Sequence, residues 1–268
     1  MALGWINPED FSFNSILLME RFQIRFMLSS HAHDGERRRA LGIALRANPA
    51  VRWYIERMCP ESAAFVAGMA DNSPEVCGAA DIRRAEVYTL GGIEDFVIYT
   101  QPELMQTHCP FIYGWHKDRL FEMADFDGKI VLDVGSGSGR LAFAAAERAK
   151  EVYASEPVAT LRAFIQDKAE REGIHNIRVS DGFANRLAYP NHWFDIVMSG
   201  HVVGDDYEGE IAELTRVCKP GGWLLDCRGD QLGNDAPFAE LRALGWEEMW
   251  YRNSFGKDTY RYRFCVPV

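Results

Sequence analysis

The stretch KIVLDVGSGSGRL, residues 129–141, joins a short apolar run to three glycines at alternate positions. The aliphatic residues of this run are mostly β-branched and suit a strand that is covered on both faces, as in a parallel sheet. The glycines then allow a tight turn without side chains in the way, and a helix-forming stretch follows. We therefore predict a buried strand, a turn whose backbone a ligand can touch, and a helix.

Two classes of nucleotide-binding turn compete for this stretch. The dinucleotide fingerprint needs a small residue at its third glycine position, so that helix and strand can pack closely. Counted from Gly135, that position is Arg140, which is long and charged. The pattern Asp133, Gly135, Gly137 and Gly139 instead resembles the first motif of the class I S-adenosylmethionine-dependent methyltransferases.

Further motifs follow in the order of that family. Residues 151–157, EVYASEP, predict a second strand ending at Glu156, whose carboxylate suits the two hydroxyls of a nucleoside ribose. Residues 176–181 predict a third strand ending at Asp181, where the family holds the adenine edge. Two more strands are expected at residues 194–200 and 222–229, the last of them preceded by a Lys-Pro-Gly-Gly turn.

The alternation of strands and helices from residue 126 onward predicts a parallel sheet with right-handed crossovers. This alternation ends near the C-terminus, where residues 246–254 and 259–266 are predicted to form a β-hairpin. The resemblance implies a doubly wound α/β fold with seven strands in the order 3-2-1-4-5-7-6, the last antiparallel. A nicotinamide-binding half would continue with another crossover instead. Helices are expected at residues 139–150, 158–172, 207–218 and 236–244.

Residues 1–125 are expected to form a mainly helical lid or substrate region, and residues 126–268 the cofactor-binding domain. Several prolines and Asp34 are spaced along residues 1–125 and indicate where the helices of this region begin. The short run FVIYT, residues 96–100, is strand-like. The expected helices cover residues 8–30, 35–47, 49–59, 60–71 and 74–90.

Charge and composition narrow the class of partner. The chain has 268 residues, 47% of them hydrophobic, and a net charge of −10 without a basic tail, which disfavours a nucleic-acid substrate. Its six cysteines are scattered, which suits a reducing compartment better than a disulfide scaffold. The first long apolar run, residues 11–28, carries charges that a membrane span would not tolerate. We expect a cytoplasmic protein that acts on a small molecule, with no membrane partner; assembly into a homo-oligomer is left open.

The resemblance places the cofactor, S-adenosylmethionine, at the carboxyl ends of the strands. Glu156 and Asp181 could each instead be solvated loop acids, and Trp115 and its aromatic neighbour Tyr113 could serve only in packing. The residues expected to contact the cofactor are Asp133, Gly135, Ser136, Gly137, Gly139, Glu156, Pro157, Asp181, Gly182, Phe183, Ser199, Gly200, Trp115 and Arg119.

His201 follows the fourth strand and is the candidate general base, with Asp205 or Asp206 to orient it. An unperturbed imidazole with a pKa of about 6.5 can accept a proton at neutral pH. The alternative is that His201 only lines the pocket. No metal site is expected, because the remaining candidates match no zinc spacing: His31, His33, Cys59, Cys77, His108, Cys109 and His116.

The leading hypothesis is methyl transfer from S-adenosylmethionine to a small molecule. Residues 199–202, SGHV, lack the Asn/Asp-Pro-Pro-aromatic motif of the methyltransferases that modify nucleic-acid amino groups. The pattern is similar to the small-molecule, methyltransferase-11-like branch. Two alternatives stay open: a cofactor-binding regulatory or scaffold protein without catalysis, and a nicotinamide-dependent oxidoreductase.

Overall fold

The computed structural model describes residues 4–74, 78–204, 206–233 and 236–268. Its contacts divide the chain into two units, Met1–Leu104 and Met105–Val268, here called the helical unit and the sheet unit. The division falls after Leu104, whereas we expected it after residue 125. The segment that leads into the first strand therefore belongs to the sheet unit.

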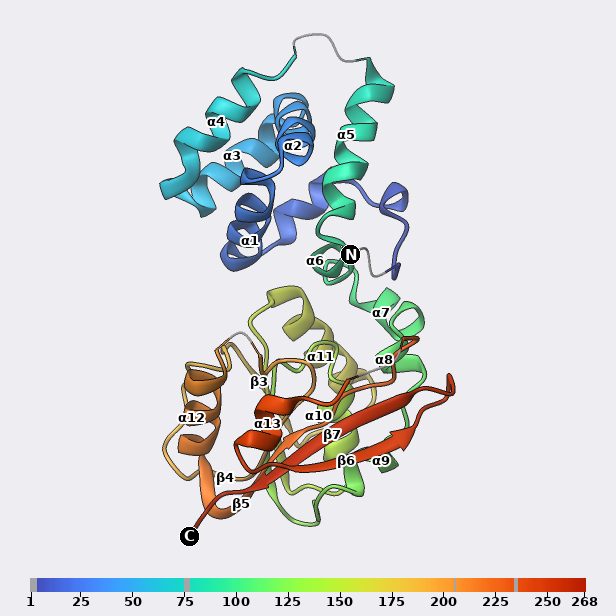
Figure 1. Cartoon of the computed structure of the whole chain (residues 1–268), viewed down its shortest axis with the longest axis vertical. Coiled ribbons are helices and arrows are strands. Elements are labelled where there is room, and N and C mark those ends of the chain that lie inside the picture. Colours follow the sequence, from blue (N-terminus) through green and yellow to red (C-terminus); the bar gives the residue numbers. More distant parts are fainter. Residues whose placement is uncertain (1–3, 75–77, 205, 234–235) are drawn as a thin grey trace. The chain divides into compact units, whose positions relative to one another are not determined.

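Local sequence signals set several helix ends in the helical unit (Figure 1). Asp34 accepts hydrogen bonds from the backbone N–H groups of Glu36 and Arg37, so α2 begins at Gly35 as predicted. Pro49 occupies the first position of α3, where its missing N–H costs nothing. The elements are the 3-10 helices η1 (Pro8–Asp10), η2 (Phe13–Leu18) and η3 (Pro60–Ser62) and the α-helices α1 (Arg21–Ala32), α2 (Gly35–Ala47), α3 (Pro49–Met58), α4 (Ala63–Asp71), α5 (Ala79–Gly91) and α6 (Glu94–Ile98).

The prediction of one helix over residues 8–30 is wrong. The chain forms η1 and η2 first, and α1 starts only at Arg21. A capping box causes this restart: Gln23 Oε1 accepts the N–H of Glu20 at 2.8 Å, and the Glu20 side chain accepts the N–H of Gln23. The helical spacing of the apolar residues therefore did not predict that the chain leaves the helical conformation between η2 and α1.

The strand expected at residues 96–100 is also wrong, because these residues lie in α6 and the turn that follows it. Ile93 and Val97 are both fully buried and stand one helical turn apart. A helix therefore buries this short apolar run without needing a partner strand. The expected helix at residues 74–90 is α5, which begins at Ala79; residues 75–77 lie outside the described part of the chain.

The sheet unit contains the predicted seven-stranded sheet in the order β3-β2-β1-β4-β5-β7-β6. β1 pairs in parallel with β2 and β4, with Val131 opposite Val152 and Ile196. β7 runs antiparallel to both β5 and β6, which confirms the terminal hairpin. The strands are β1 (Ile130–Val134), β2 (Glu151–Ser155), β3 (Ile177–Ser180), β4 (Phe194–Ser199), β5 (Cys218–Asp226), β6 (Glu247–Arg252) and β7 (Asp258–Cys265).

Side chains of β1 alternate between two apolar cores. Val131 packs with the core that includes Leu141 of α10, and Leu132 packs with the core that includes Leu214 of α12. Both faces of the sheet are therefore covered, which explains why β1 is an almost unbroken apolar run. The helices of this unit are α8 (Pro110–Tyr113), α9 (Asp118–Phe121), α10 (Arg140–Ala146), α11 (Ala159–Arg171), α12 (Tyr207–Val217) and α13 (Ala239–Ala243), and α7 (Pro102–His108) spans the division between the units.

The fifth strand begins earlier than expected. Cys218 already pairs with Phe194, and the register then shifts before Trp223 pairs with Ile196. The Lys-Pro-Gly-Gly sequence thus forms an irregularity inside β5 instead of a turn before it. Within the described residues, none of the helices has the length and apolar character needed to cross a membrane.

Candidate functional site

The glycine turn after β1 is built as the sequence predicts. Gly135, Gly137 and Gly139 all have positive φ angles, of 64°, 57° and 87°, which side chains other than glycine rarely adopt. A Cβ atom on Gly135 would lie 2.5 Å from Val202 Cγ2, whereas one on Gly137 would meet no atom within 4 Å. The backbone of Gly137 therefore faces open space, where a ligand can reach it.

Asp133 lies in β1 directly below this turn and is almost completely buried. Its Oδ2 atom has no hydrogen-bond partner among the described residues. Burial raises the pKa of Asp133 to about 7, although the positive charge of Arg140 opposes this shift. A buried acceptor of this kind suits a cationic or hydrogen-bond-donating group of a ligand, or a water molecule.

Glu156 follows β2 and holds the glycine turn. Its Oε2 atom accepts the N–H of Gly137 at 2.8 Å, and its Oε1 atom accepts the N–H of Val158 at 2.9 Å. Burial raises the pKa of Glu156 to about 7, against the effect of these hydrogen bonds. The carboxyl group follows the second strand, as we expected, and supports the turn through these two hydrogen bonds. Pro157 separates it from α11.

The residues after β3 form an exposed edge beside Glu156. Asp181 is exposed, and its Oδ1 atom lies 3.5 Å from Arg162 Nη1, which also donates to the backbone oxygen of Glu156 at 2.7 Å. A Cβ atom on Gly182 would lie 2.3 Å from Ser155 Oγ, so only glycine fits there. Phe183 is 40% exposed at this edge.

Residues after β4 lie close to the segment after β5. Ser199 is buried. A Cβ atom on Gly200 would lie 2.7 Å from Arg140 Nη2 and 2.8 Å from the oxygen of Cys227, which explains the need for glycine there. His201 has a φ of 65°, and its Nε2 atom accepts the N–H of Gly229 at 3.3 Å. Because a backbone N–H can only donate, the proton of the neutral imidazole is assigned to Nδ1.

His201 is poorly suited to take up a proton in this arrangement. Its pKa is lowered to about 3, first by the many protein atoms around the ring and then by the positive charges of Arg228 and Arg140. His201 is nevertheless exposed, and the surrounding solvent limits how far its pKa falls. Of its two expected partners, Asp206 instead caps α12 through the N–H of Gly209. Asp205 lies outside the described residues.

The segment before β1 contributes aromatic side chains. The Trp115 ring covers the guanidinium of Arg140, with 4.4 Å between its centroid and Cζ, and its Nε1 atom has no partner among the described residues. Arg119 and Tyr113 have other neighbours: Arg119 stacks on Tyr251 at 4.4 Å and Tyr113 contacts the ring of Phe255. Of this segment, Trp115 packs on Arg140 beside the glycine turn, whereas Arg119 packs on the terminal hairpin.

Arg140 was overlooked as a functional residue, since the sequence argument used it only against a dinucleotide site. Its Nη2 atom donates to the backbone oxygen of Cys227 at 2.9 Å, although 87 positions separate the two residues. Its Nη1 atom is shielded from solvent and has no partner among the described residues. The only sequence signal was a long charged residue directly after the last glycine of the turn.

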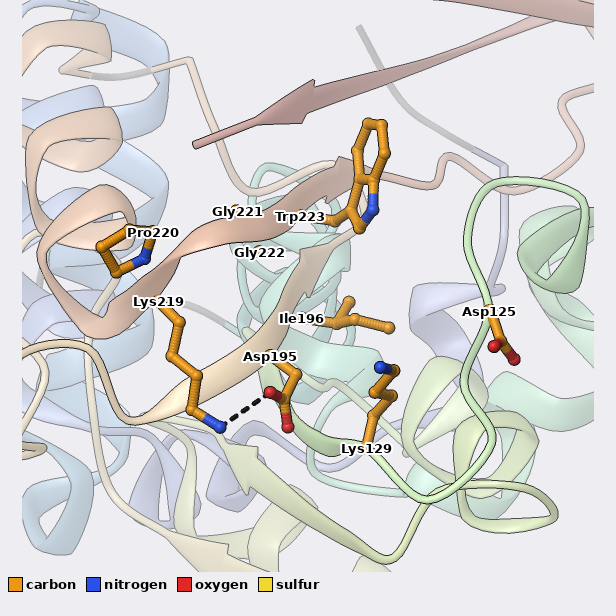
Figure 2. A pocket seen from close by; sticks show the side chains of 9 residues that line it. All are labelled: Asp125, Lys129, Asp195, Ile196, Lys219, Pro220, Gly221, Gly222 and Trp223. Carbon is orange, nitrogen blue, oxygen red and sulfur yellow. Dashed lines mark hydrogen bonds and ion pairs between the residues drawn. The ribbon is translucent and has the colours of Figure 1, made fainter. Parts of the chain in front are cut away.

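A pocket lies at the amino ends of β1, β4 and β5, away from the glycine turn (Figure 2). Lys219 Nζ contacts Asp195 Oδ1 at 2.7 Å there, while Asp195 Oδ2 accepts the N–H of Ile130 at 2.9 Å. These contacts join β4, β5 and β1 and give Asp195 a structural role. The pocket is lined by Asp125, Lys129, Asp195, Ile196, Lys219, Pro220, Gly221, Gly222 and Trp223.

The scattered histidines and cysteines do not converge. In the described part of the chain, no group of three or more His, Cys, Asp or Glu side chains is arranged to hold a metal ion. Cys77, one of the candidates considered, lies outside the described residues. His31 is buried in the helical unit, where its Nδ1 atom donates to the oxygen of Met27 at 2.8 Å.

Comparison with known proteins agrees with the topology. A family model described as a methyltransferase domain matches residues 131–222. A demethylmenaquinone methyltransferase of Geobacillus stearothermophilus is 32% identical over 159 residues, which are 58% of this chain and 61% of that protein. An arsenite methyltransferase of Aquipseudomonas alcaligenes is 30% identical over 138 residues, 47% of this chain and 40% of that protein. The chain thus spans 61% or less of the length of these two relatives.

A solved structure supports the fold alone. It is that of a candidate S-adenosyl-L-methionine-dependent methyltransferase from Methanococcus maripaludis, with a TM-score of 0.50 at 14% identity. The similarity covers 63% of this chain and 91% of that one. The match of residues 131–222 to a methyltransferase-domain family and the strand order 3-2-1-4-5-7-6 identify a methyltransferase domain with the class I fold in the sheet unit.

Proposed function

We propose that the protein transfers a methyl group from S-adenosylmethionine to a small-molecule acceptor. The open backbone of Gly137 beside the Glu156 carboxyl group, 2.8 Å from N to Oε2, is the observation that carries this proposal. A nucleoside ribose needs an acceptor for its hydroxyls, and a carboxylate next to a turn without side chains supplies one. Both groups stand at the carboxyl ends of parallel strands, where α/β sheets bind ligands.

The buried polar atoms of the site fit the rest of the cofactor. Asp133 Oδ2, which has no partner among the described residues, suits the ammonium of the methionine portion, directly or through water. Phe183 and Asp181 stand after β3, where they can contact the adenine ring and its edge. Arg119 is left out, because its guanidinium stacks on Tyr251. The proposed contacts come from Asp133, Gly135, Ser136, Gly137, Gly139, Glu156, Pro157, Asp181, Gly182, Phe183, Ser199, Gly200 and Trp115.

The protein contributes to this reaction mainly by positioning the cofactor and the acceptor. S-adenosylmethionine, when bound, supplies a methyl group already activated on a sulfonium sulfur. The glycine turn and Glu156 fix the nucleoside, and Trp115 shields the site from water, so that an acceptor can stand in line behind the methyl group. His201 lines the acceptor side with a neutral imidazole in this proposal. Its alternative role as a base requires that Nε2 release the N–H of Gly229.

Isothermal titration calorimetry tests the cofactor. We expect binding of S-adenosylmethionine and S-adenosylhomocysteine and no binding of NAD. Tighter binding of NAD than of either sulfur nucleoside would disprove the proposal. The antiparallel β7 already argues for this outcome, because a nicotinamide-binding half would have continued with a further crossover.

The acceptor and partners are part of the same proposal. A net charge of −10 disfavours the backbone of a nucleic acid, and both named relatives are methyltransferases of small substrates according to their names. We therefore propose a small-molecule acceptor and no nucleic-acid partner. Size-exclusion chromatography with light scattering measures whether the protein is a homo-oligomer.

We also propose that the helical unit serves as the lid over the site. Methyl transfer needs a pocket closed against water, and in this proposal the helical unit supplies that closure. Hydrogen exchange with and without S-adenosylhomocysteine should show slower exchange in the helical unit as well as at the glycine turn. Protection confined to the sheet unit would favour the alternative, in which the helices bind a protein partner and the chain is a regulatory module.

A further inference from the structure

β6 forms one edge of the seven-stranded sheet (Figure 1). Its six residues pair with β7 on one side, and among the described residues no strand pairs with them on the other side. Natural sheets usually protect such an edge, because its unpaired N–H and C=O groups can pair with another chain. β6 has neither a proline nor a bulge in its pairing with β7, and the large side chain of Trp250 within it is 62% exposed. The edge thus lacks two of the usual obstacles to a further strand.

The terminal hairpin shows which backbone groups of β6 point outward. Asn253 N–H donates to the oxygen of Lys257 at 2.7 Å, in the register that pairs β6 with β7. In an antiparallel strand, alternate residues direct both their N–H and their C=O groups to the same side. Counted back from Asn253, the N–H and C=O groups of Arg252, Trp250 and Glu248 therefore point away from β7.

The side chains of these three residues lie on one face of the sheet, because successive side chains of a strand alternate between its faces. Trp250 and Arg252 are exposed, and the Glu248 side chain is 24% exposed. Within the strand, Glu248 stands two positions before Trp250, and Arg252 stands two positions after it. The pattern is symmetric about Trp250 in position and opposite in charge. It is therefore complementary to an antiparallel copy of itself.

We propose that β6 pairs with β6 of a second copy of this chain, antiparallel and across a twofold axis at Trp250. In this register the Trp250 side chains of the two copies are neighbours, and Glu248 of each copy lies opposite Arg252 of the other. The outward N–H and C=O groups of these residues meet as hydrogen-bonded pairs. Opposite charges and aromatic rings placed directly across two strands stabilise the pairing. The two sheets thereby become one continuous sheet.

The two charges favour this register over its neighbours. Two copies can shift their pairing only in steps of two residues, because outward-pointing groups must meet outward-pointing groups. A twofold axis at Met249 would place Glu248 opposite Trp250, and an axis at Tyr251 would place Arg252 there. Both shifts leave the charges without opposite partners across the interface. A strand of another protein would need the same charge pattern to pair equally well.

The proposed contact is small, because a standard protein interface takes about 20–30 residues from each partner. We therefore expect a weak dimer that forms at high concentration. Sedimentation equilibrium of the full chain should show the average mass rising from that of one chain toward that of two between micromolar and near-millimolar concentration. W250E sets two carboxylates against each other at the axis and should raise the dissociation constant at least about tenfold. W53E is the matched control, because Trp53 is 60% exposed on α3 of the helical unit.

A charge-swap series tests the register. E248K and R252E each set like charges opposite each other between the copies and should weaken the dimer about tenfold, because two such pairs form in each dimer. The double variant E248K/R252E restores opposite charges and should return the dissociation constant to within about threefold of the wild type. Within one chain, Glu248 accepts the Tyr262 hydroxyl at 3.2 Å and Arg252 pairs with Asp258 at 2.8 Å. The double variant loses both of these contacts, so its recovery can come only from pairing between copies.

Each result decides for or against the pairing. A wild type that stays monomeric at near-millimolar concentration would overturn the proposal and leave the two charges as protection of the edge against pairing. A dimer that W250E does not weaken, or single charge variants that the double variant does not rescue, would show that the copies meet elsewhere. Circular dichroism checks that each variant is folded, and the charge-swap series decides the question if W250E is not.

Discussion

Replacing Glu156 by glutamine should change how the stability of the protein depends on pH. In the native state Glu156 is 4% exposed, and burial raises its pKa from 4.5 to about 7. This acid is harder to ionise in the folded state than in the unfolded state. Its contribution to the free energy of unfolding of the wild type is therefore fully present below pH 4.5 and is lost as the pH rises through about 7. The full shift corresponds to about 3 kcal/mol, of which about 2 kcal/mol should appear between pH 5 and pH 8.

Glutamine does not titrate, so this contribution is missing from E156Q. The free energy of unfolding of the variant relative to the wild type should therefore rise by about 2 kcal/mol between pH 5 and pH 8. The absolute value also contains the loss of one acceptor for the N–H groups of Gly137 and Val158, but that loss does not depend on pH in the same way. Asp133 titrates in both proteins, and because the negative charge of Glu156 is only the smallest of the influences on its pKa, most of its contribution cancels in the difference.

Urea denaturation followed by circular dichroism at several pH values measures this difference. E172Q serves as the control, because Glu172 is an exposed residue at the end of α11. Parallel curves for E156Q and the wild type would refute the reasoning and would mean that Glu156 is not buried as described. In calorimetry at pH 8, E156Q should also bind S-adenosylhomocysteine about 10- to 100-fold more weakly, since charge-assisted hydrogen bonds contribute about 1.5–3 kcal/mol each.

Three further substitutions test separate parts of the chain. Gly135→Ala places a Cβ atom 2.5 Å from Val202 Cγ2 at a φ of 64°, so calorimetry should show at least tenfold weaker binding of S-adenosylhomocysteine; unchanged affinity would contradict the geometry of the turn. Asp34→Ala removes the cap of α2 and should lower the free energy of unfolding by about 1 kcal/mol in urea titrations, with Asp34→Asn as the tolerated control. Tyr251→Phe leaves Asp230 without its 2.5 Å donor and should cost about 1–3 kcal/mol of stability; a neutral effect would show that the hydroxyl is dispensable.

The sequence determined most of the sheet unit, because its signals are local. An apolar run followed by alternating glycines predicts strand, turn and helix, and the positive φ angles of the three glycines confirm that reading. The capping residue Asp34 likewise set the start of α2. At residues 8–30 the apolar pattern alone predicted one continuous helix, which is wrong. The reciprocal capping box between Glu20 and Gln23 starts a new helix at Arg21.

Only the tertiary structure decided the chemistry at the ends of β4 and β5. His201 follows a predicted strand, yet its lone pair is used by Gly229, 28 positions away, and Arg140 reaches the oxygen of Cys227 across 87 positions. Hydrogen bonds over such separations depend on which strands become neighbours, and the pairing of β5 with β4 and β7 is fixed by burial of the whole sheet. Residue types and spacing predicted a candidate site, but the proton affinity and charge within it arise from groups that only folding brings together.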